Sequence, residues 1–267
     1  MSEWVFGVDS SAPVESAFLE AVRLAYGTPA LWGRYLSGAG TALTALEAEL
    51  IGGLGVGIVP IVARGPSGTP VSQEEIQDGY PGGLRTAAAA ATLARAVGVP
   101  QGTSIVIDVE PGYLPKGQDT WWLVGVSDGL RQAGYLPVLY GGEIGDGTPE
   151  GGWTLAEALA AIQPPNATEA FVAAPPLLWD ADWGGANEPP PQDGTVDVLA
   201  HAPAPGPWSA VCGRQFRGNV VIGDFAVDLD VWLIGAPDAV VPWRPGPGPD
   251  VARAVELLRQ ALAALGG

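Results

Sequence analysis

The chain has 267 residues, of which 47% are hydrophobic and 15% charged, so it is large enough to form one big domain or two small ones. Its formal net charge of −17 argues against nucleic acid or an anionic membrane surface as a partner. One Cys and one His exclude an intrachain disulfide and a cysteine zinc cluster, and they disfavour Ser-His-Asp catalysis and multi-His metal sites. No apolar run is long enough to span a membrane.

Apolar strand patterns alternate with Ala- and Leu-rich helical patterns, as in the βα units of a parallel sheet. The predicted strands are 3–10, 31–37, 56–65, 103–111, 136–142, 169–179, 209–218 and 225–234. The predicted helices are 13–27, 43–55, 82–98, 121–135 and 154–162. This order predicts an α/β fold, a (β/α)8 TIM-type barrel that is irregular near its strands six to eight. A doubly wound open sheet is the alternative, although no Gly-rich dinucleotide turn follows the first strand.

The barrel is expected to occupy residues 1–240, followed by a Pro/Gly linker at 241–250 and an amphipathic helix at 251–267. Apolar residues of that helix recur at alternating spacings of four and three, at Val251, Val255, Leu258, Leu262 and Leu265. This is the pattern of a short coiled coil, which would join copies of the chain or a tail-protein partner through 251–265. It is equally the pattern of an amphipathic helix that packs on the barrel, and both alternatives remain open.

Carboxylates stand at the ends of several predicted strands. Asp9 ends the first strand, Asp108 and Glu110 end the fourth, and Asp228 and Asp230 lie in the eighth. In a (β/α)8 barrel the catalytic residues gather where the strands end, so these acids are expected to converge. Crowded carboxylates raise one another's pKa, so that one can stay protonated as a general acid while its neighbour is ionised.

Other residue types near the same strand ends suit a sugar cleft, in which carboxylates supply acid/base chemistry and aromatic rings face the pyranose. These residues are Tyr140, Trp179, Asp180, Asp182 and Gln215. Two alternatives stay open from the residues alone. Clustered oxygens also suit a divalent cation, and an Asp-x-Glu can simply end a strand and cap the next loop.

The segments "FGVDSS", "GRYLS", "GIVPIVA", "VIDVEPG", "LPVLYGG", "LLWDADW" and "RQFRGNVVIGDFAVDLDVW" follow one another over most of residues 4–235. In this order they resemble the glycoside hydrolase family 25 muramidases, and more closely the glycoside-hydrolase-like domains of actinobacteria and their phages. The resemblance implies a barrel that cleaves the β-1,4 bond between N-acetylmuramic acid and N-acetylglucosamine in peptidoglycan, without a cofactor.

The resemblance also implies roles for individual residues. Glu110 would be the general acid, and Asp108 would stabilise the positive intermediate or orient the acetamido group of the substrate. Asp9 and Asp228 would support the site, and Tyr140, Trp179 and Gln215 would line the sugar subsite. Some relatives of this kind bind glycan only, so a catalytically inactive glycan-binding barrel is the alternative function.

The N-terminal sequence "MSEWVFGVDSS" shows no secretory signal. We therefore expect a protein that reaches the bacterial cell wall inside a virion, as a phage tail protein, or after release by lysis.

Overall fold

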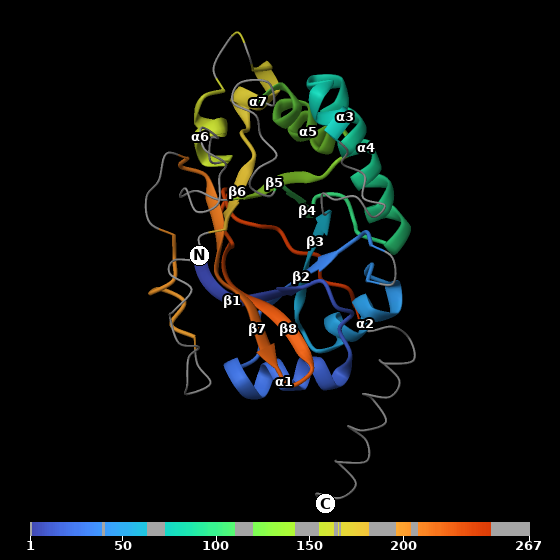
Figure 1. Ribbon diagram of the computed structural model, residues 1–267, viewed down its shortest axis with the longest axis vertical. Coiled ribbons are helices and arrows are strands. Elements are labelled where there is room, and N and C mark those ends of the chain that lie inside the picture. Colours follow the sequence, from blue (N-terminus) through green and yellow to red (C-terminus); the bar gives the residue numbers. More distant parts are fainter. Residues whose placement is uncertain are drawn as a thin grey trace, which may run out of the picture.

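The computed structural model describes most of the chain (Figure 1). The described residues are 2–38, 41–62, 73–109, 120–141, 155–162, 165, 167–181, 196–203 and 208–246. The predicted site residues Glu110 and Asp182, and the predicted helix 251–267, lie outside these ranges.

Eight strands form a closed barrel in which each strand pairs with its neighbours in chain order (Figure 1). The strands are β1 Glu3–Ser10, β2 Leu31–Tyr35, β3 Gly57–Val62, β4 Ser104–Asp108, β5 Leu136–Gly141, β6 Leu177–Asp180, β7 Val211–Ile222 and β8 Phe225–Ile234. The predicted (β/α)8 barrel is thus confirmed, and the open-sheet alternative is wrong because β8 pairs with β1.

The last strand departs from the parallel pattern, since β8 is antiparallel both to β7 and to β1. The two residues between β7 and β8 form a hairpin turn at Gly223, whose φ of 62° suits a residue without a side chain. A parallel crossover needs a dozen or more residues, so this short connection forces the chain to reverse. The start of β8 consequently lies beside the end of β1, and Asp228 pairs with Asp9.

Helices cover the outside of the barrel. They are α1 Ser16–Tyr26, α2 Ala45–Gly53, α3 Gln73–Gln77, α4 Tyr80–Val97, α5 Thr120–Gln132, α6 Leu155–Ala160 and α7 Glu169–Ala173. The helix α7 corrects the predicted sixth strand, because residues 169–173 are helical and the strand begins only at Leu177. The Thr168 side chain caps this helix by accepting a hydrogen bond from the Phe171 backbone N–H.

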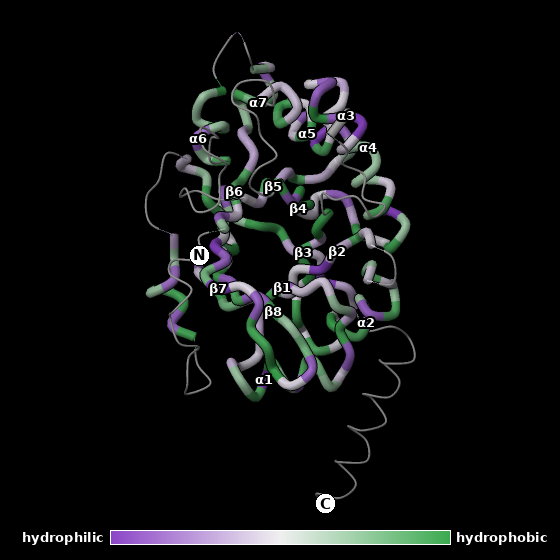
Figure 2. Tube along the Cα trace, viewed as in Figure 1, coloured by the Kyte–Doolittle hydropathy of each residue, from purple (hydrophilic) through white to green (hydrophobic). Residues whose placement is uncertain are grey.

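The strands are largely hydrophobic, and hydrophilic residues recur on outer helices such as α3 and α4 (Figure 2). One hydrophobic cluster lies between the sheet and the helices, and a second fills the barrel interior. In the interior, Trp232 packs against Trp179 with ring centroids 4.5 Å apart. A Cβ on Gly7 would lie 2.5 Å from Trp232, so only glycine leaves room for the indole there.

The end of the barrel where the parallel strands begin is closed by the segment 240–246, which we call the floor strap. Val240 is buried in the interior cluster, and the Ser104 backbone N–H donates to the Val241 carbonyl at 2.8 Å. Trp243 exchanges two backbone hydrogen bonds with Ile58 of β3. Residues 241–246, which were expected to be linker, therefore pack as part of the barrel.

Candidate functional site

The opposite end of the barrel, where β1 to β6 end, is called the mouth here. Asp9 and Asp228 are register partners on β1 and β8, and Asp230, two residues along β8, lies on the same inward face. Gln215 of β7 ties this group together. Its Nε2 donates to Asp9 Oδ2 at 2.8 Å and to Asp228 Oδ2 at 3.3 Å. The structure thus brings together four of the residues that the sequence singled out.

Burial makes these acids weak. Desolvation, followed by the nearby charge of Asp228, raises the pKa of Asp9 to about 8, and the Gln215 hydrogen bond only partly opposes this. Burial also raises the pKa of Asp228, although the Asn219 backbone N–H favours its ionised form. The pKa of Asp230 lies well above its usual range because it is buried and faces Asp9 and Asp228. Near neutral pH the group therefore holds protons that ordinary aspartates would have lost.

A second row of inward residues joins the acids across the mouth. Asp108, Tyr140 and Trp179 are register partners on β4, β5 and β6. The Tyr140 hydroxyl donates to Gln215 Oε1 at 2.7 Å, while the other end of that amide holds the acids. These contacts form one side of a single polar cluster, made of Asp108, Tyr140, Gln215 and Asp9. Because the Gln215 amide lies between a phenol and two carboxyls, its orientation is fixed.

The aromatic residues form a packed base rather than an open wall. Tyr140 is 7% exposed and Trp179 only 1%, and their ring centroids lie 4.5 Å apart. Trp179 in turn packs on Trp232. Tyr140, Trp179 and Trp232 thus form one continuous series of packed rings inside the barrel.

Asp180 does not join the cluster. Successive residues of a strand face opposite sides, so Asp180 lies on the outer face of β6, while Trp179 lies on the inner face. Its register partner on β7 is Arg214, likewise on the outer face because Gly213 and Gln215 face inward. We interpret Asp180 as a buried residue between the sheet and its outer layer.

Tyr35 is a mouth residue that the sequence did not indicate. It ends β2, is half-buried, and is close enough to Tyr140 to contribute to the raised pKa of that phenol. A lone Tyr within "GRYLS" carries no chemical signature of its own. Its position at the end of a predicted strand was the only signal available.

Within the described ranges, no three His, Cys, Asp or Glu side chains are grouped so that they could hold a metal ion. The helices described in the structure also include none with the length and apolar character needed to cross a membrane.

Residues 28–192 match the family model described as "Rv2525c-like, glycoside hydrolase-like domain". This span is more than half of the chain, so the chain belongs to that family. A search of curated proteins found no match to the chain.

Solved structures show the same fold. An uncharacterized protein from B. stearothermophilus has 24% sequence identity and a TM-score of 0.68, over 89% of this chain and 100% of that one. The Tat-secreted protein Rv2525c of Mycobacterium tuberculosis, solved with L-tartrate, has 17% identity and a TM-score of 0.54, over 90% and 98% of the two chains. At these identities the likeness extends to the fold alone.

Proposed function

We propose that this glycoside-hydrolase-like barrel is a peptidoglycan-directed hydrolase of the muramidase type. The observation that carries the proposal is the inward cluster at the mouth, where acids of β1 and β8 accept from the Gln215 amide and Asp108 of β4 lies beside Tyr140. Carboxyl groups with separated pKa values are what glycosidic bond cleavage requires. The choice of peptidoglycan as substrate rests on the resemblance of the strand-end motifs to the muramidases.

In this proposal Glu110 is the general acid, which protonates the oxygen of the leaving sugar. Its partner Asp108 stabilises the positive charge that develops on the cleaved ring or orients the acetamido group of the substrate. Asp108 is 3% exposed and is the last residue of β4, at the mouth. Glu110 itself comes two positions later in the chain.

Asp9 and Asp228 serve as supporting groups. A neutral Asp9 can accept the Gln215 N–H without adding a full negative charge beside Asp108. Tyr140 and Gln215 line the sugar subsite in this proposal, together with Trp179, which packs against Tyr140. The network fixes the direction of each donor before substrate arrives, which reduces the reorganisation needed during the reaction.

A glycan-binding barrel without catalysis is the second candidate. The tight burial of the described acids favours it, because Asp9, Asp108 and Asp230 are each 3% exposed or less. Acids of this kind could shape a polar recess that holds a sugar without cutting it. The two candidates share the ligand and differ in whether Glu110 transfers a proton.

Either function requires the protein to meet the bacterial cell wall. We propose delivery as a virion tail component or by lysis, with export as the competing route. The relative Rv2525c is described as Tat-secreted, which supports action outside the cytoplasm for that protein. Residues 251–265 remain a candidate attachment to a tail-protein partner or to copies of this chain.

The test is release of reducing sugar from purified actinobacterial peptidoglycan by the wild-type chain and by Glu110→Gln. The amide retains the shape of the side chain and removes its acid, so the rate should fall by about 100-fold or more. Glu3→Gln is the matched control, because Glu3 is an exposed acid at the other end of β1. A wild-type chain that sediments with cell walls yet releases no sugar would establish the binding function and reject the enzyme.

A further inference from the structure

A buried ion pair lies beside the mouth, between β2 and α2. Arg34 is fully buried and Glu47 is 7% exposed. Arg34 Nε donates to Glu47 Oε1 at 2.6 Å, and Arg34 Nη2 donates to Glu47 Oε2 at 3.3 Å. Gly33 is the register partner of Asp9 and shares its inward face, so the next residue, Arg34, points out of the barrel toward α2. The pair therefore adjoins the mouth acids without being part of their cluster.

The Arg34 guanidinium also binds two backbone carbonyls. Nη1 donates to the Ser10 carbonyl at 2.7 Å, and Nη2 donates to the Thr41 carbonyl at 2.9 Å. Ser10 is the last residue of β1 and directly follows Asp9, whereas Thr41 lies in the connection from β2 to α2. Because a guanidinium is planar and its N–H groups have fixed directions, this one side chain sets the end of β1 relative to that connection.

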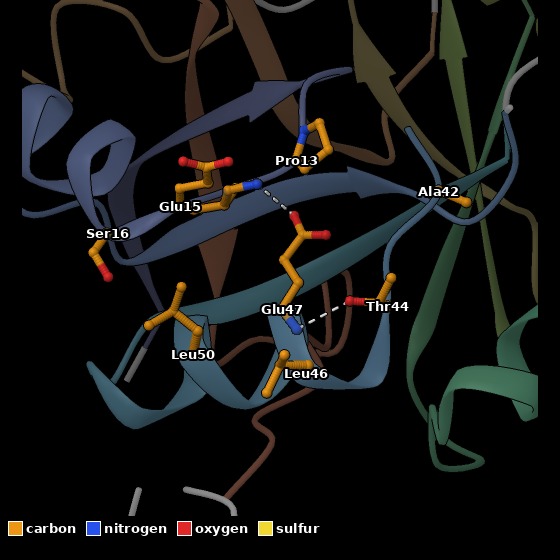
Figure 3. Close-up of a pocket in the computed structure, with 9 residues that line it drawn as sticks. Pro13, Glu15, Ser16, Ala42, Thr44, Leu46, Glu47 and Leu50 are labelled. Atoms are coloured by element: carbon orange, nitrogen blue, oxygen red, sulfur yellow. Dashed lines mark hydrogen bonds between the residues drawn. The ribbon is translucent and has the colours of Figure 1, made fainter. Parts of the chain in front are cut away.

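Glu47 extends the same network from α2 (Figure 3). Its Oε1 accepts from the backbone N–H of Val14, in the connection from β1 to α1, at 2.7 Å. The Glu47 backbone N–H donates to Thr44 Oγ1 at 3.1 Å, which caps the start of α2. The connections that follow β1 and β2 are thus both bound to one ion pair.

An ion pair is not the most stable way to fill this layer. Two buried charges lose their hydration, and apolar side chains of similar volume often give equal or greater stability. An apolar side chain, however, could not hold the Ser10 carbonyl in one direction. The pair is therefore better explained by the geometry that it imposes than by stability.

Asp9 is the mouth acid on which this geometry acts. A Cβ on Gly33 would lie 2.6 Å from the Asp9 Cβ, so β1 and β2 meet closely at this point. The charge of Arg34 also favours the ionised form of Asp9 and so lowers its pKa, against the larger effect of burial. The titratable and charged groups of the described residues that act on this carboxyl or respond to it are Arg34 of β2, Asp228 and Asp230 of β8, and Tyr140 of β5.

We propose that Arg34 and Glu47 are a positioning pair, which holds the end of β1 so that Asp9 meets Gln215 and Asp228. Both residues act through the Ser10 backbone and through charge, and neither belongs to the inward face that would meet a sugar. That the mouth is the working end rests on the proposed function, whereas the hold on Asp9 does not.

The first test is the pH titration of the Asp9 carboxyl, followed by ¹³C NMR in the full chain labelled at its aspartate carboxyl carbons. Asp9→Asn identifies the signal by its loss. The double variant Arg34→Met, Glu47→Met replaces the pair by apolar side chains with no change in net charge, so the barrel should stay folded, which circular dichroism checks. Release of β1 admits water to Asp9, and its midpoint should fall from about 8 by about one pH unit or more.

Arg34→Lys is the second variant, because it keeps the positive charge and loses the planar fork that reaches Ser10 and Thr41. The Asp9 midpoint should fall in this variant too. The exposed pair on α1 provides the matched control, since Glu20→Met, Arg23→Met removes the same two charges and should leave the midpoint at its wild-type value. A wild-type midpoint in both Arg34 variants would overturn the proposal and reduce the pair to a structural contact.

Sugar release gives a second measure. With Asp9 misplaced, Arg34→Lys should lower kcat on peptidoglycan by about tenfold and change the apparent KM by less than about twofold. A kcat equal to that of the wild type would overturn the positioning role in the reaction. If the wild-type chain releases no sugar, the proposed function fails, and the Asp9 titration alone decides whether Arg34 and Glu47 hold the end of β1.

Discussion

The two ends of the barrel are closed by buried residues of opposite character. In the interior Trp232 packs on Trp179, and at the floor Val240 is buried and the strap bonds to β3 and β4. At the mouth, Asp9 and Asp230 are buried with raised pKa values around the Gln215 amide. Apolar burial stabilises a fold, whereas burial of carboxyls costs free energy. The floor stabilises the closed sheet. The buried polar groups of the mouth cost folding free energy, which we attribute to a functional role of that end.

The largest effect on stability is expected in the apolar interior of the barrel. Trp232→Ala removes a fully buried indole that packs on Trp179, so the free energy of unfolding should fall by about 3–5 kcal/mol. Urea denaturation measures the change. Trp121→Ala is the control, because Trp121 is 37% exposed and should cost much less. Equal losses in the two variants would contradict the assignment of the apolar interior as the main source of stability.

A buried acid at the mouth, in contrast, should make stability depend on pH. The folded state holds the Asp9 proton between its usual pKa of 3.8 and about 8, so the native chain binds more protons than the unfolded one over that window. Its contribution to stability is therefore full at low pH and is lost as pH rises, by up to about 1.4 kcal/mol per pH unit.

Asp9→Asn removes this titration. Urea midpoints at about pH 5 and about pH 8.5 should differ less in the variant than in the wild type, and the variant should be the more stable chain at the higher pH. Asp228 and Asp230 leave a residual dependence. Asp224→Asn, at the exposed tip of the β7–β8 hairpin, is the control and should leave the wild-type dependence in place. A variant with the same pH dependence as the wild type would show that Asp9 is ionised throughout.

The smallest predicted change in stability comes from a pair of variants that distinguishes the mouth of the barrel from its floor by function. Tyr140→Phe removes a buried hydrogen bond to Gln215, and Tyr135→Phe removes one to the Val99 carbonyl at the floor side of the barrel. Each should lower the free energy of unfolding by about 1–2 kcal/mol. Only Tyr140→Phe should also lower sugar release or glycan binding, because only that phenol reaches the mouth. Equal functional losses in both would mean that the loss follows stability rather than site chemistry.

Much of this comparison could be predicted from the sequence, since strand periodicity and the rule that barrel sites lie at strand ends indicated Asp9, Asp108 and Asp228. The predicted strands do not include the antiparallel direction of β8, although the six residues between the last two of them, 219–224, are too few for a parallel crossover. Asp180 is predicted as a site residue because the predicted sixth strand, 169–179, ends at Trp179 and Asp180 follows it. Alternation along the strand would have placed it outside.

Other features depend on tertiary contacts. The short apolar run "EAFVA" at 169–173 favours a strand, although Thr168 before it is a typical helix cap. Trp243 falls in the predicted linker because Pro and Gly surround it in the sequence, and its pairing with Ile58 shows that it packs on the barrel. The pKa of Asp9 depends on burial by strands far apart in the chain, which no local pattern records.

The most direct test of the account identifies the sugar at the newly formed chain end. Peptidoglycan is digested with the full chain, reduced with borohydride and hydrolysed, and the reduced sugars are identified by mass spectrometry. A muramidase-type site at the mouth predicts reduced muramic acid in the wild-type digest and none above background with Glu110→Gln. Reduced glucosamine in its place, or no reduced sugar at all from the wild type, would contradict it.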